Sequence, residues 1–205
     1  MPLPKPTRLG GLAAILGGIM LIVHSVGAAS MPRGCIGDVE CATRPMRDTG
    51  VFEVFFLLAL PLLLAGMASL ALRARKAGRF GRLGWASMIL GSAAAAALSG
   101  AIVVQTFFFG GDFPLMPYFV IPGGLALLVG FALVGIVVLR AGVLPRWTSA
   151  LLVVSTIAML WFNDQNAFVL LGIPFALAWM TVGYMLLSSR RDAIRQTTQY
   201  AEGAP

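Results

Sequence analysis

Three polar side chains lie inside long apolar runs, where a buried polar group is costly and is therefore a candidate for function. His24, Glu53 and Gln105 each lie a few residues from the end of a run that the sequence predicts to be a helix. The helical rise places all three at a similar depth near the outer surface, beneath Asp112 and Asp164 as an acidic rim. Such a cluster could form an outward-facing pocket that binds a cation or passes a proton. In the alternative interpretation, Glu53 extends to the membrane surface and His24 makes a hydrogen bond between helices.

The sequence also offers sulfur and imidazole groups that are typical metal ligands. Met20 and His24 are four residues apart and share a helix face, which would suit copper or haem. Sulfur-containing residues follow at Met31, Cys35, Cys41 and Met46. Methionine, however, is a common filler of apolar cores, and the chain has only one His and two Cys. We therefore expect no metal centre and no cofactor.

Cys35 and Cys41 lie in the connection between the first two apolar runs. Outside a bacterial cell such a pair is normally oxidised, and closing this short loop would stabilise the protein by about 2 kcal/mol. A redox role would more naturally use the Cys-x-x-Cys spacing. We predict a structural disulfide.

A dense group of cations lies between the second and third apolar runs. Such a group can hold the head groups of anionic lipids, although the rules of membrane topology explain it equally well. Its members are Arg73, Arg75, Lys76, Arg79 and Arg82.

The sequence lacks the motifs that would indicate an enzyme. It has no phosphate-binding Walker loop, no His-Glu-x-x-His and no Gly-x-Ser-x-Gly. None of the connections between the apolar runs is long enough to form a domain of its own, so we expect no catalytic activity.

The composition indicates which elements must position these side chains. Of 205 residues, 59% are hydrophobic and only 11% are charged, and the mean hydropathy is +0.89. Soluble domains carry about 25% charged residues, so the sequence excludes a water-soluble enzyme and a disordered chain. The net charge of +7 does not indicate nucleic-acid binding, because the cations gather in short segments between apolar runs. We predict an all-α integral membrane protein.

Six runs are long enough, or nearly so, to cross a bilayer as helices. They occupy residues 9–29, 51–72, 83–109, 118–139, 147–162 and 167–187. The fifth is the shortest, and the third, with its alanine run 93–97, is expected to be the most enclosed. We divide the chain into an N-terminal tail (1–8), a six-helix membrane domain (9–189) and a C-terminal tail (190–205).

The distribution of Lys and Arg predicts the orientation. Alternate connections carry twelve of these residues on one side and only Arg33, Arg44 and Arg47 on the other. Cations accumulate on the cytoplasmic side, so both termini should face the cytoplasm of a bacterial inner membrane.

The N-terminus also imitates a cleavable signal peptide, because an apolar run follows Lys5 and Arg8 and ends in Gly27-Ala28-Ala29. An internal repeat favours retention of this run. Residues 8–10 and 15–17 read Arg-Leu-Gly and Ile-Leu-Gly, and residues 82–84 and 89–91 repeat both at the same spacing. Together with prolines in the second, fourth and sixth runs, this pattern indicates three tandem helical hairpins.

Small residues at intervals of four predict close helix contacts, either within the chain or with a second copy. They form two stripes: Gly10, Ala14 and Gly18 on the first helix, and Gly91, Ala95 and Ser99 on the third.

A resemblance can be stated on two segments. Residues 139–147 read Leu-Arg-Ala-Gly-Val-Leu-Pro-Arg-Trp, and the last run carries Ala178-Trp179 and Gly183-Tyr184 before Ser188-Ser189-Arg190-Arg191. Over residues 50–191 the chain loosely resembles small six-helix bacterial membrane proteins of unknown function. The resemblance implies a topology and no site residues.

Two classes of function are compatible with these observations. In the first, the protein is a scaffold, an accessory subunit or a binder of lipid or another small ligand, with membrane lipids and a second copy or another membrane protein as partners. In the second, it is a small transporter or channel whose entrance is the pocket at His24, Glu53 and Gln105. Ionisable residues are absent from the inner halves of the helices, so we favour the first class.

Overall fold

The computed structural model describes residues 5–33, 50–109 and 115–202, and these are almost entirely helical. These residues form six α-helices, with two short 3₁₀ helices between the fifth and the sixth. Their bounds are α1 Lys5–Ser30, α2 Phe52–Lys76, α3 Gly81–Phe108, α4 Met116–Ala141, α5 Arg146–Ala158, η2 Met159–Trp161, η3 Ala167–Leu171 and α6 Gly172–Glu202. The described ranges contain no β-strand. The prediction of an all-α protein is confirmed.

Within the described ranges, five helices are long and apolar enough to cross a membrane. These segments are Thr7–Ser30, Phe52–Lys76, Gly81–Gln105, Met116–Ala141 and Ala167–Ser188. The fifth predicted run forms a shorter apolar helix, Arg146–Trp161, in which α5 gives way to 3₁₀ geometry at Met159. Long apolar helices of this kind are expected of a membrane protein.

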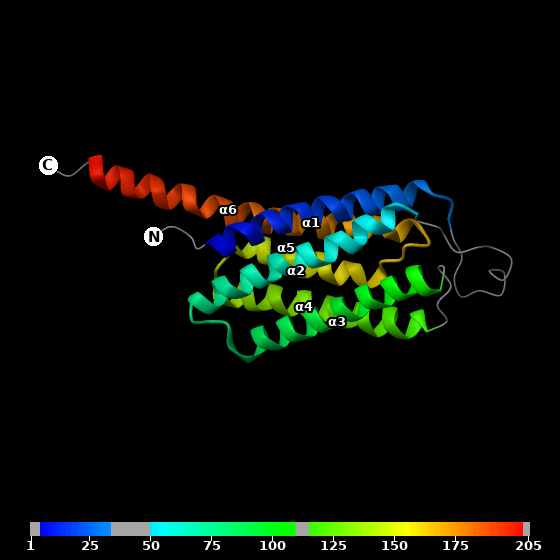
Figure 1. Ribbon diagram of the computed structural model, residues 1–205. Coiled ribbons are helices and arrows are strands. Elements are labelled where there is room, and N and C mark those ends of the chain that lie inside the picture. The colour runs from blue at the N-terminus through cyan, green and yellow to red at the C-terminus, as the bar shows by residue number, and fades with distance from the viewer. Residues whose placement is uncertain (1–4, 34–49, 110–114, 203–205) are drawn as a thin grey trace.

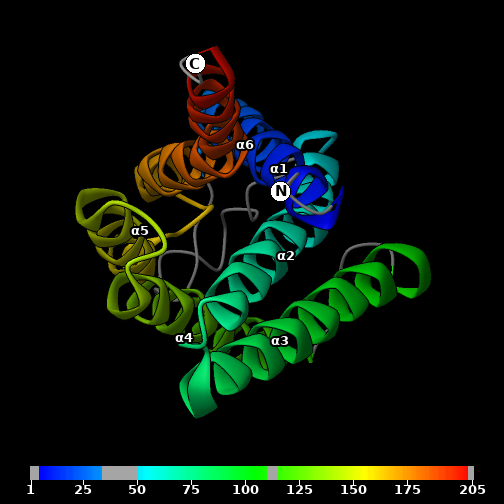
Figure 2. The same cartoon turned by 90° about the vertical axis from the view of Figure 1, so that its left-hand side faces the viewer.

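The helices run along one common direction, and the last part of α6 extends beyond the bundle (Figure 1). Viewed along that direction, α1 lies between α2 and α6, and α5 lies between α4 and α6 (Figure 2). Helix α3 packs mainly on α4 and to a lesser extent on α2. The connections α2–α3 and α4–α5 lie at the same end of the bundle, which we call the basic end; the opposite end is called the His24 end.

The hairpins predicted from the repeat differ in how closely they pack. Helices α1 and α2 pack along their lengths, as do α3 and α4. Helix α6 packs more extensively on α1 than on its hairpin partner α5, because α5 is short and followed by non-helical turns. The first and the last helix, α1 and α6, therefore lie side by side.

Small residues allow α1 to pack closely between its two neighbours. A Cβ atom added to Gly10 would overlap the Ser69 side chain of α2. A Cβ added to Gly18 would lie 2.8 Å from the Ala176 carbonyl oxygen of α6. The small-residue stripe of α1 therefore makes its close contacts within the chain.

The core of the bundle centres on three aromatic rings. The Phe131 ring of α4 lies 5.4 Å from Phe175 and 5.2 Å from Trp179, both of α6, in edge-to-face geometry. Trp179 is fully buried. Such pairs add attraction beyond the area they bury, so the cluster ties α4 to α6.

The expectation that α3 is the most enclosed helix is wrong. Only 39% of its membrane-length segment is buried, against 50% for α6. Within the alanine run, Ala94 and Ala95 are buried, whereas Ala93, Ala96 and Ala97 are exposed. Helix α3 is less enclosed than expected because it has neighbours only on the side that faces α4 and α2.

Candidate functional site

At the His24 end, the imidazole of His24 is buried between α1 and α2. Its Nδ1 atom lies 3.0 Å from the Phe52 carbonyl oxygen, and its ring centroid lies 5.1 Å from that of Phe56. A carbonyl oxygen can only accept a hydrogen bond, so Nδ1 carries the hydrogen and donates it. The bond satisfies a polar group that would otherwise be costly to bury.

The turn between η2 and η3 brings further polar groups to this end. The backbone N–H of Gln165 donates to Asn163 Oδ1 at 2.9 Å, and its side-chain Nε2 donates to Asp164 Oδ1 at 3.1 Å. Gln165 is buried. The structure thus places Asp164, predicted as a rim residue, at the same end of the bundle as His24.

The other predicted residues of this pocket are distributed differently. Glu53 is half-buried in the first turn of α2, next to the Phe52 carbonyl that holds His24. Gln105 is half-buried on α3, which packs on α4 and α2, whereas His24 lies on α1, which packs on α2 and α6. Asp112 lies outside the described residues, as do Cys35 and Cys41, so the disulfide remains a prediction.

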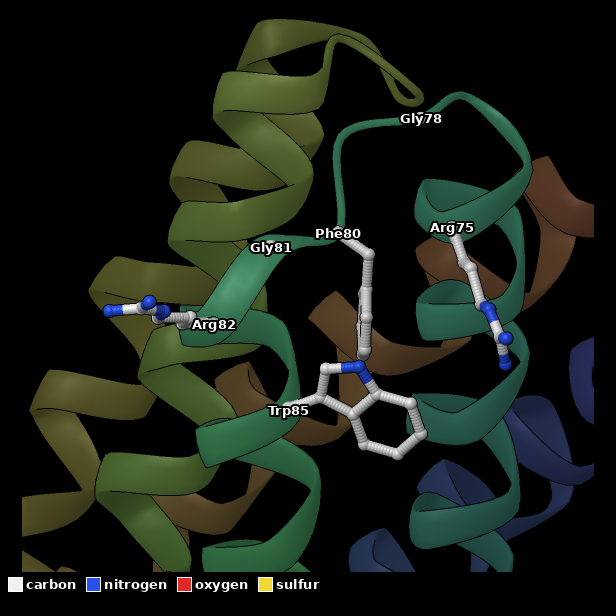
Figure 3. Close-up of a pocket in the computed structure, with 6 residues that line it drawn as sticks. All are labelled: Arg75, Gly78, Phe80, Gly81, Arg82 and Trp85. Atoms are coloured by element: carbon white, nitrogen blue, oxygen red, sulfur yellow. The ribbon is translucent and has the colours of Figure 1, made fainter.

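At the basic end, a hollow of about 420 Å³ opens at the α2–α3 connection (Figure 3). The guanidinium carbon of Arg75 lies 5.8 Å from the centroid of the Trp85 ring, close enough for a cation–π contact. Phe80 meets the same indole edge-on at 5.6 Å. The hollow is lined by Arg75, Gly78, Phe80, Gly81, Arg82 and Trp85.

Two glycines make this geometry possible. Gly78 and Gly81 have φ angles of +69° and +53°, a left-handed conformation that is unfavourable for residues with a Cβ atom. They turn the chain from α2 into α3 within a few residues, and Phe80 between them is buried against Ala74 and Val137. Arg75 and Trp85, at the ends of two different helices, are thereby brought together.

The five predicted cations of this connection have different roles in the structure. Arg79 Nη1 donates to the Ala141 carbonyl oxygen at 3.0 Å and so fastens the connection to the end of α4. Arg73 is half-buried, while Lys76 and Arg82 are exposed. Figure 3 shows that the Arg82 side chain points away from Trp85, whereas Arg75 lies beside it.

Phe80 and Trp85 were not predicted as site residues. The sequence does carry a signal for them, since two aromatic residues accompany the Gly78 and Gly81 turn and its cations. Among the residues that the structure describes, no three His, Cys, Asp or Glu side chains form a group that could hold a metal ion.

The described residues define a class: an all-α protein in which five helices have the length and composition of membrane spans. No protein-family model, curated protein or solved structure matches the chain.

Proposed function

We propose that this is a multi-pass membrane protein that binds anionic lipids at its basic end and acts as a scaffold or accessory protein without turnover of its own. In this proposal six helices span a bacterial cytoplasmic membrane, with both termini and the basic end on the cytoplasmic side. The cytoplasmic leaflet carries anionic lipids, so the cations and the lipids would face each other.

The observation that carries the proposal is the Arg75–Trp85 contact at the edge of the hollow. Tryptophan prefers the level of the lipid head groups, where its ring is apolar and its N–H can reach water. Arg75, Lys76 and Arg82 are exposed around it and are available to phosphate groups. Cations near a membrane surface contribute about 1 kcal/mol each to binding anionic lipid.

The scaffold role rests on the exposed surface of α3. Ala93, Ala97 and Gly100 are exposed along one side of this helix, and nothing lies within 4 Å of a Cβ added to Gly100. Small residues allow close approach of another membrane helix. A second copy or another membrane protein is therefore the proposed partner. We also propose that the chain is related to the small six-helix membrane proteins of unknown function that it resembles.

The proposed function predicts a preference for anionic lipid that depends on the basic end. Purified protein in detergent should bind phosphatidylglycerol more tightly than phosphatidylcholine, as measured by native mass spectrometry. Replacing both Lys76 and Arg82 with Gln should weaken phosphatidylglycerol binding by about 2 kcal/mol, or roughly 30-fold, since two surface charges are lost.

Arg33→Gln is the matched control, because Arg33 is exposed at the opposite end of the bundle and should not affect binding. Equal affinity for the two lipids would contradict the proposal. Cation flux in proteoliposomes that is abolished by Glu53→Gln would instead support the alternative, a transporter with its entrance at the His24 end.

The proposed topology can be tested by thiol labelling of a variant without native cysteines. Gly78 and Gly142 mark the two basic connections, but both have positive φ and tolerate cysteine poorly. Ala77→Cys and Pro145→Cys place exposed thiols beside them. A membrane-impermeant reagent added to intact cells should label neither, and should label Val51→Cys, which is exposed at the other end. Labelling of Ala77→Cys from outside would overturn the topology.

A further inference from the structure

The buried side of α5 carries hydroxyl groups where the buried side of α4 carries apolar residues. The buried residues of α5 are Thr148, Ser149, Leu152, Ser155 and Thr156. Those of α4 are all apolar or glycine. A hydroxyl group inside a helical bundle is costly to bury unless it has a hydrogen-bond partner. The partners of these four hydroxyl groups therefore determine how firmly α5 is held.

The four hydroxyl groups fall into two pairs. Ser155 Oγ and Thr156 Oγ1 donate to the Leu152 carbonyl oxygen at 3.1 Å and 2.7 Å. Thr148 Oγ1 and Ser149 Oγ are fully buried and have no hydrogen-bond partner within the described ranges. This second pair lies in the first turn of α5, at the basic end of the bundle. An unpaired hydroxyl that reaches water gains the hydrogen bond it lacks, so both groups favour a movement that exposes the first turn.

Helix α5 also has few contacts that keep it in the bundle. It packs less extensively on α4 and α6 than α1 packs on α2 and α6. The chain enters α5 through Gly142, with a φ angle of +61°, and through Pro145, which lies outside the helix and has no backbone N–H to bond. At its other end α5 passes into η2. Sparse packing and irregular connections are features of segments that open locally.

We propose that the start of α5 is a hinged segment that opens at the basic end. In the closed form Thr148 and Ser149 are buried without a partner, and in the open form both hydroxyl groups bind water. The chain turns in the connection between Gly142 and Pro145. This inference is independent of the proposed lipid binding, because it concerns the α4–α5 connection and not the cations of the α2–α3 connection.

Two contacts limit the movement. Arg79 Nη1 donates to the Ala141 carbonyl oxygen at 3.0 Å, so the end of α4 stays in place while the chain beyond it turns. Leu144, within the connection, is buried in the core and must be released before the first turn of α5 can open. The cost of exposing Leu144 keeps the closed form dominant.

Thiol reactivity in a full-length variant without native cysteines tests for the open form. Ser149→Cys and Ser87→Cys each place a thiol at a fully buried serine within the first two turns of a helix at the basic end. They differ because Ser87 Oγ donates to the Gly84 carbonyl oxygen at 2.7 Å on the better packed α3. In detergent, a small water-soluble thiol reagent should modify Ser149→Cys roughly tenfold faster. Equal rates would overturn the hinge.

Hydrogen exchange of the α5 backbone gives a second measurement that needs no cysteine. Thr148→Val keeps the shape of the side chain and removes an unpaired hydroxyl, so it should stabilise the closed form and slow exchange roughly tenfold. Thr156→Val is the matched control on the same helix, because it removes a hydroxyl that is already paired, and it should not slow exchange. Exchange in Thr148→Val that is no slower than in the parent protein, or equal slowing in both variants, would overturn the proposal.

Discussion

Replacing Trp179 with alanine is expected to lower the free energy of unfolding by about 3–5 kcal/mol, as is typical for large aromatic side chains in a core. The Trp179 side chain is fully buried and contacts Phe131 of α4 and Phe175 of its own helix. Removing it leaves a cavity where α4 and α6 meet. Unfolding in mixed micelles with increasing denaturing detergent measures this loss.

Two variants serve as controls for Trp179→Ala. Trp161 is 62% exposed, so Trp161→Ala should cost less than about 1 kcal/mol. The Trp179 Nε1 atom is buried and has no hydrogen-bond partner in the described part of the chain. Trp179→Phe should therefore lose packing alone and retain most of the stability. A Phe variant as unstable as the Ala variant would contradict this account.

Replacing Gly130 with alanine is expected to cost about 3 kcal/mol, the upper part of the usual range for an overpacked contact. Its added Cβ would lie 2.9 Å from both the Cα and the N atom of Gly91, at the point where α4 crosses α3. Backbone atoms cannot rotate away as a side chain can, so the two helices must separate. The same unfolding measurement reports the effect.

Gly124 provides the control on the same helix. Nothing lies within 4 Å of a Cβ added there, so Gly124→Ala should be neutral or should stabilise α4 by up to about 1 kcal/mol, since alanine favours the helix. Similar destabilisation by the two substitutions would contradict the close crossing with α3 as the cause of the cost at Gly130.

The positions of the helices could be predicted from the sequence, because the length of each apolar run indicates the length of the helix that it forms. The run at 9–29 lies within α1, and the run at 147–162 covers α5 and η2 with an error of one residue at each end. Which face of a helix is buried was not predictable in the same way. In a membrane both the lipid-facing and the protein-facing sides of a helix are apolar, so hydrophobicity does not distinguish Ala93, which is exposed, from Ala94, which is buried.

For the candidate sites as well, the sequence predicted how far along a helix a residue lies, but not the direction in which its side chain points. The sequence indicated that His24 lies near the end of a helix, but its contact with the Phe52 carbonyl depends on how α1 and α2 are rotated. The place of Asp164 depends on the turn after η2; the polar residues 163–166 indicate where the turn lies in the sequence, but not the direction in which it carries the carboxylate. At the basic end the cations were evident from the sequence, whereas the Arg75–Trp85 contact required the positive φ angles of Gly78 and Gly81.

The short α5 has a consequence for the membrane around the protein. Its 13 residues and the three of η2 extend to about 26 Å, less than the roughly 30 Å of a typical hydrocarbon core. Helix α4 beside it has 26 residues and exceeds that thickness. Placed in a bilayer, the bundle would meet hydrophobic mismatch on one side only, and lipids with shorter acyl chains should collect along α5. Such a protein is expected to tilt toward its short side and to partition into thinner regions of the membrane.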